Sequence, residues 1–169
     1  VVIEDDYDSE FRFAGRPLPK WADEGMAMLA ESAAKREFRR SHLVAMLSRH
    51  PGYRLADLVR VDRLPPPEWR DAFYGQSAAL VTLLAHRKSP RTFADCVEDS
   101  LTIGLDQALE KHYGLAHMTA LEAEWQQAAR QPLTLLASNF VRDIEDRLSH
   151  RATAADRPAL ATNRPRAVD

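Results

Sequence analysis

Residues 68–86 read EWRDAFYGQSAALVTLLAH, and this stretch decides the fold. Its large apolar side chains recur at the spacing of one helix face: Trp69, Phe73, Leu80 and Leu84. Small residues occupy the neighbouring surface of the same helix: Gly75, Ser77, Ala78 and Ala79. Because small side chains let two helix axes approach closely, the stretch predicts a central helix packed tightly against its neighbours.

Further helical patterns flank this central helix, and prolines and glycines separate them. A run of prolines at 65–67 forms the clearest internal boundary. Residues 54–64 are expected to form either a short helix or an irregular packed segment. The other predicted helices span residues 20–35, 37–49, 89–100, 105–113, 119–129 and 135–150, and the apolar face of the second one begins at Phe38.

Three local signals predict helix ends. Ser89 stands before Pro90, the order expected of an N-cap and a first helical residue. Gly114 follows the predicted helix 105–113, where a left-handed C-cap favours glycine. Thr119 and Glu122 have the spacing of a capping box, which predicts that a helix begins there.

The fold class is therefore predicted to be all-α, a multi-helix bundle with one short extended N-terminal segment. We expect three parts: an acidic extended segment at 1–19, a helical domain at 20–150 and a disordered tail at 151–169. With 169 residues, a single domain can bury most of its apolar surface. The first residues lack the pattern of a signal peptide, and no initiator Met is present, so we expect a piece of a longer chain.

Composition excludes several classes of protein. The chain has 23 Lys and Arg against 25 Asp and Glu, and this near-neutral balance argues against nucleic acid as the main partner. A single cysteine, Cys96, excludes a disulfide framework and a cysteine-based zinc site, and we expect it to be a small buried hydrophobe. No apolar run reaches the roughly 18 residues that a membrane-spanning helix needs. No partner is indicated.

The stretch LPKWADEGMA at residues 18–27 carries a glutamate one turn into a predicted helix. Trp21 is expected to anchor the start of this helix, and Gly25 to let a neighbouring backbone approach. The Trp-x-x-Glu-Gly pattern resembles the downstream zinc-ligand motif of the gluzincin metallopeptidases, and more narrowly that of the peptidase MA-like group. Residues 72–81 and 105–125 resemble further helices of that group, so the resemblance covers roughly residues 13–130.

By this resemblance Glu24 is the third zinc ligand, and Trp21 and Tyr74 lie at the cleft, where Tyr74 would stabilise an oxyanion. The family also needs two histidine ligands and a glutamate base from a His-Glu-x-x-His helix. None of the six histidines of this chain begins that motif, so we expect the chain to be inactive and to bind the zinc of its parent family weakly or not at all. Without the resemblance, Glu24 would be interpreted as a first-turn carboxylate that favours the helix dipole, and Tyr74 as a core residue.

Residues 1–10 contain five carboxylates and neither Lys nor Arg, and we expect these carboxylates to be exposed. Together with the following residues to Pro19, this segment resembles part of the MocR-type regulators, which have a pyridoxal-phosphate-binding, aminotransferase-like domain. That resemblance implies that Asp5 pairs with the pyridine nitrogen of the cofactor and that Tyr7 contacts its phenolic oxygen. Ser32 and Lys35 have the Ser-x-x-Lys spacing of the lysine that forms the Schiff base.

Three hypotheses follow from the sequence. The first is the downstream helical half of a gluzincin-like metallopeptidase domain, and the second is a fragment of a pyridoxal-phosphate-binding regulator. The third is a helical interaction module without chemistry, in which the rings of Trp21, Tyr74 and Trp125 are buried anchors and no cleft opens onto Glu24.

Overall fold

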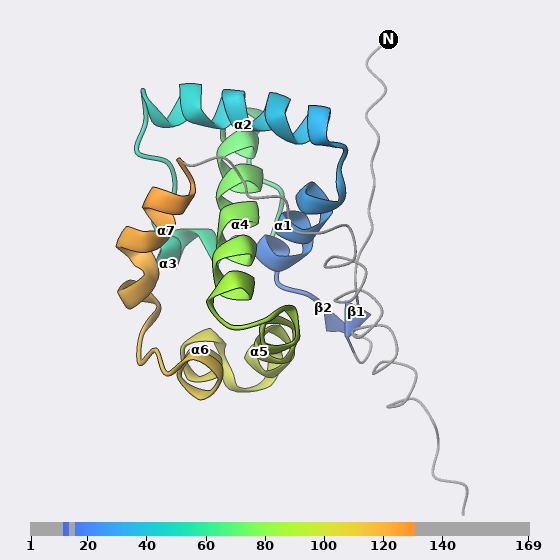
Figure 1. Cartoon of the computed structure of the whole chain (residues 1–169), viewed down its shortest axis with the longest axis vertical. Coiled ribbons are helices and arrows are strands. Elements are labelled where there is room, and N and C mark those ends of the chain that lie inside the picture. The colour runs from blue at the N-terminus through green and yellow to red at the C-terminus, as the bar shows by residue number, and fades with distance from the viewer. Residues whose placement is uncertain (1–11, 14–15, 131–169) are drawn as a thin grey trace, which may run out of the picture.

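The computed structural model describes residues 12–13 and 16–130, and these form an all-α fold, as predicted (Figure 1). A short extended segment precedes the helices: β1 (Arg12–Phe13) and β2 (Arg16–Pro17) pair antiparallel, with Arg12 opposite Pro17. The helices are α1 (Lys20–Ala30), α2 (Ala33–Leu47), α3 (Leu55–Leu58), α4 (Pro67–Arg87), α5 (Pro90–Ile103), α6 (Leu105–Tyr113), the 3-10 helix η1 (Met118–Leu121) and α7 (Glu122–Ala128).

Helix α4 runs through the middle of the fold and packs against α1, α2, α5 and α7 (Figure 1). Its predicted core positions Phe73, Leu80 and Leu84 are buried. The prediction was wrong for Trp69, which is exposed in the first turn of α4 and contacts Tyr53 edge to face, with 5.3 Å between ring centroids. The apolar stripe of α4 therefore reaches the core only from its second turn onward.

The small residues of α4 meet a second helix, as their pattern predicted. A Cβ atom added at Gly75 would lie 3.0 Å from Cγ of Leu43, which belongs to α2. Leu43 is buried, whereas Phe38 on the same helix is 62% exposed and contacts the ring of His42, with 4.3 Å between centroids. The prediction that Phe38 belongs to the apolar face of α2 was wrong, because that face points into the core at the buried Leu43 and Leu47.

A buried amide fixes the loop between α2 and α3. The Gln76 side chain of α4 accepts a hydrogen bond from the backbone N–H of Tyr53 at 2.8 Å and donates one to its carbonyl oxygen at 3.2 Å. The backbone carbonyl of Gln76 accepts the indole N–H of Trp125 at 2.9 Å. This one residue therefore connects the loop to α4 and α4 to α7.

The break between α1 and α2 falls earlier than the sequence predicted. We expected one helix over 20–35, but α1 ends at Ala30 and Ser32 caps α2, its hydroxyl accepting the N–H of Lys35 at 3.3 Å. The Arg36 guanidinium then donates to the carbonyl oxygens of Leu29, at 3.0 Å, and of Glu31. These contacts satisfy carbonyl groups at the end of α1, so the break is stable despite an alanine-rich sequence.

Two of the three predicted helix ends are confirmed. The Ser89 hydroxyl accepts the N–H of Thr92 at 3.0 Å, and Gly114 adopts the left-handed conformation with φ at 70°. The capping box at Thr119 is wrong, because α7 begins at Glu122. The Glu122 carboxylate instead accepts the N–H of Leu55 at 2.8 Å, which fixes α3 against α7.

Several sequence predictions fall outside the described residues: the acidic start with Asp5 and Tyr7, the helix over 135–150 and the tail over 151–169. Within the described part of the chain, Cys96 is buried, as expected, and burial raises the pKa of its thiol to about 12. No helix among the described residues has the length and apolar character that crossing a membrane requires.

Candidate functional site

The first turn of α1 is anchored in the core by Trp21. This side chain is buried and meets Phe93 of α5 edge to face, with ring centroids 6.3 Å apart. Trp125 is also buried, so two of the three aromatic anchors of the interaction-module hypothesis belong to the core. Tyr74 differs from both, because it is only half-buried.

Gly25 brings the backbones of α1 and α4 together. A Cβ atom at this position would lie 2.8 Å from the carbonyl oxygen of Ser77 and 2.7 Å from Cγ2 of Val81. Both distances are too short for a real side chain, so only glycine allows this approach. The expected role of Gly25 is therefore confirmed, and the approach fixes the position of Glu24 relative to α4.

The Glu24 carboxylate lies at the edge of this contact, with 21% of its side chain exposed. Lys20, one turn earlier, places its ammonium 3.9 Å from Glu24 and 3.8 Å from the buried Asp23. Two carboxylates and one ammonium therefore share the start of α1, where the helix dipole also favours negative charge.

Tyr74 lies on α4 within electrostatic reach of Glu24. Burial raises the pKa of the Tyr74 phenol, and the negative charges of Glu24 and Glu31 raise it further. Arg39 and Arg70 act in the opposite direction. The charge of Glu24 on α1 therefore acts on Tyr74 on α4, although 50 positions separate the two residues in the sequence.

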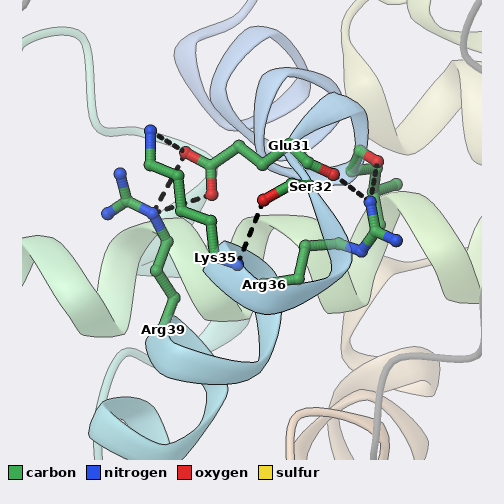
Figure 2. A network of polar contacts seen from close by, with 6 residues as sticks. Glu31, Ser32, Lys35, Arg36 and Arg39 are labelled. Carbon is green, nitrogen blue, oxygen red and sulfur yellow. Dashed lines mark hydrogen bonds and ion pairs between the residues drawn. The ribbon is translucent and has the colours of Figure 1, made fainter.

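The sequence did not predict a polar network around Glu31, which Figure 2 shows. The Glu31 carboxylate accepts Nε–H of Arg39, at 2.9 and 3.1 Å to its two oxygens, and pairs with Nζ of Lys35 at 3.0 Å. The guanidinium carbon of Arg39 lies 5.2 Å from the centroid of the Tyr74 ring, in cation–π geometry. Glu31, Lys35 and Arg39 follow one another at intervals of four residues, a spacing that could have indicated this network. The helix predicted over 20–35 contained no break beside Glu31, so the network was not expected.

The described residues do not form a complete zinc site. A gluzincin site needs three protein ligands, whereas the described part of the chain has no group of three or more His, Cys, Asp or Glu side chains placed to hold a metal ion. Glu24 could supply one carboxylate oxygen to such a site. No catalytic step through zinc is therefore derived for these residues.

Lys35, the lysine of the Ser-x-x-Lys spacing, lies in the first turn of α2. Its side chain is 59% exposed and forms an ion pair with Glu31, and Ser32 serves as the N-cap of α2. The Ser-x-x-Lys spacing is thus explained by helix capping, because an N-cap hydroxyl bonds the N–H of the third residue after it. Asp5 and Tyr7, the other residues of this hypothesis, lie outside the described residues.

No protein family model, curated protein or solved structure matches the chain. The contacts of Glu24, Tyr74 and their neighbours are therefore the basis for a functional proposal.

Proposed function

We propose that this chain is the downstream helical part of a gluzincin-like metallopeptidase domain, in which Glu24 is the third zinc ligand. One observation carries the proposal: the close contact of α1 and α4 holds the half-buried Glu24 within electrostatic reach of Tyr74. A ligating carboxylate and a phenol that can donate to an oxyanion are two of the groups that a zinc peptidase of this kind would use.

The rigidity of this arrangement supports the proposal. A metal ligand must be held within a few tenths of an ångström of its position, which favours ligands on well-packed helices. Glu24 follows the buried Trp21 by one turn and directly precedes Gly25, whose backbone lies against Ser77. Burial raises the pKa of the Tyr74 phenol further above neutral pH, and the protonated phenol can act as a hydrogen-bond donor.

The proposed role does not require the chain alone to be active. Two further ligands and a general base are needed, and by the family resemblance they belong to a His-Glu-x-x-His helix that precedes the Glu24 motif. We therefore expect the isolated chain to be catalytically silent and to bind zinc weakly, through Glu24.

Paramagnetic metal mapping on the isolated chain tests the role of Glu24. Substoichiometric Co²⁺ should broaden the amide NMR signals around Glu24, and Glu24→Gln should remove this broadening, because the amide lacks the charge of the carboxylate. Glu37→Gln is the matched control, since Glu37 is an exposed carboxylate on α2 paired with Arg40. The proposal fails if broadening around position 24 is the same in Glu24→Gln, or if the isolated chain holds one zinc tightly through other residues.

A further inference from the structure

The guanidinium of Arg39 is held from one side only. Its Nε–H donates to Glu31, and its planar group lies over the ring of Tyr74. No other described residue accepts a hydrogen bond from its two terminal nitrogens, and both point away from Glu31 in Figure 2. Four N–H groups of a fixed cation are thus directed away from the protein contacts that hold it.

Neighbouring arginines do not share this arrangement. Arg40, the next residue, uses both Nε and a terminal nitrogen on Glu37. Arg36 donates to two carbonyl oxygens at the end of α1, and Arg70 donates through Nε to the carbonyl of Pro65. Only Arg39 among these four combines a fixed orientation, contact with Tyr74 and a side chain that is 27% exposed.

A free guanidinium edge is suited to a planar anion. Two parallel N–H groups of arginine match the two oxygens of a carboxylate, and such paired hydrogen bonds are among the strongest in proteins. Holding the cation in place beforehand lowers the entropic cost of binding.

Charges of both signs lie around the free edge of Arg39, because the ammonium of Lys35 pairs with Glu31. The Glu31 carboxylate contacts Arg39 directly. The negative charge of Glu24 raises the pKa of the Tyr74 phenol, and Arg39 lies over the Tyr74 ring. An anion bound here would be repelled by both carboxylates. The attraction to Arg39 grows with the charge of the ligand as this repulsion does, so the choice of a carboxylate rests on the peptide substrate of the proposed function.

We propose that the free edge of Arg39 binds a carboxylate of the peptide substrate beside Glu24 and Tyr74. This inference rests on the proposed function, which makes a peptide the substrate. The carboxylate belongs either to the C-terminus of the peptide or to an aspartate or glutamate side chain, and these sources share the same chemistry.

The test compares three N-acetylated peptides on the unmodified chain: a trialanine with a free C-terminus, its C-terminal amide, and an amide with aspartate at the central position. Dissociation constants are measured by NMR titration in the presence of a chelator, so that no metal takes part. At least one of the two anionic peptides should bind about tenfold or more tightly than the neutral amide, and the better one identifies the source. Equal affinity for all three peptides would overturn the inference.

Matched variants locate the binding site. Arg39→Gln should abolish the difference between the anionic and neutral peptides, whereas Arg40→Gln should preserve it. Arg40 is a close control because it lies on the same helix and its side chain is also 27% exposed. If both variants lost the affinity difference equally, a site at Arg39 would be refuted. The carboxylate site would also be refuted if inorganic phosphate displaced the anionic peptide with an inhibition constant below the dissociation constant of the peptide.

The outcome is distinguishable from failure of the proposed function, because the peptide titration contains no metal and does not depend on Glu24 as a ligand. If the anionic peptide binds selectively but Glu24→Gln does not change metal binding, the carboxylate-binding site at Arg39 stands and the peptidase assignment falls. Metal binding through Glu24 without peptide selectivity would remove the Arg39 inference alone.

Discussion

Around its two glycine contacts, helix α4 meets α1 through backbone atoms as well as a side chain, but meets α2 through a side chain alone. On the first face Gly25 lies against the carbonyl of Ser77, and on the second face Gly75 receives the Leu43 side chain. Contact between backbones leaves no freedom to adjust, whereas a leucine can change its rotamer. The comparison indicates that the α1 contact fixes the position of Glu24, while Arg39 on α2 is held by the Glu31 carboxylate and the Tyr74 ring.

The largest expected effect is the loss of the α1 anchor. Trp21→Ala should lower the free energy of unfolding by about 3–5 kcal/mol, because it removes a buried ring and leaves a cavity beside Phe93. Phe38→Ala on α2 is the control and should change it by at most about 0.5 kcal/mol, since Phe38 is exposed. Urea unfolding measures both, and a similar cost for the two variants would contradict the role of Trp21 as the core anchor of α1.

Gly25→Ala should have the next largest effect. Alanine favours a helix over glycine by about 1 kcal/mol, but the new methyl group would overlap backbone atoms of Ser77, at a cost of about 3 kcal/mol. The net destabilisation is therefore about 2 kcal/mol, measurable by the same unfolding experiment. An increase in stability would show that α1 and α4 can separate freely.

Gly75→Ala should be much milder. The added methyl group meets only the side chain of Leu43, which can move to another rotamer at a cost of about 1 kcal/mol. The gain in helix propensity offsets this cost, so the free energy of unfolding should change by less than about 1 kcal/mol. A loss as large as that of Gly25→Ala would mean that the α2 face is as rigid as the α1 face.

The smallest effect concerns the protonation of Tyr74. Its folded pKa is raised, so the corresponding contribution to stability is complete below pH ~10 and is lost as the pH rises through the folded value. Arg39→Gln removes a positive charge that lowers this pKa and should raise the pKa further. Phenolate absorbance, with Tyr74→Phe to assign the signal, measures the shift. Arg40→Gln should leave it unchanged, and an equal shift in both variants would contradict the contact with Arg39.

Local signals explain how much of the fold could be predicted. The caps at Ser89 and Gly114 depend on neighbouring residues alone, and both were predicted correctly. The break beside Ser32 depends on Arg36 reaching back to the end of α1, a contact that opposes the local helix propensity. The false capping box has a similar cause, because Glu122 is engaged by Leu55, which lies far away in the sequence.

The site divides in the same way. Trp21 and Gly25 could be assigned their packing roles because helical spacing alone places both on the face of α1 that meets other helices. The contact of Arg39 with Tyr74 could not be predicted, since it depends on the angle at which α2 leaves α1. Sequence patterns therefore identified Trp21 and Gly25, which pack α1 against its neighbours, and missed the contact between Arg39 and Tyr74.

The zinc content of a longer chain, extended by the residues encoded before Val1, tests the central claim most directly. The proposed function predicts one zinc per chain, held through Glu24, so that Glu24→Gln weakens zinc binding about tenfold or more while Glu37→Gln does not. A longer chain that holds no zinc, or that holds it equally well with glutamine at position 24, would contradict the account.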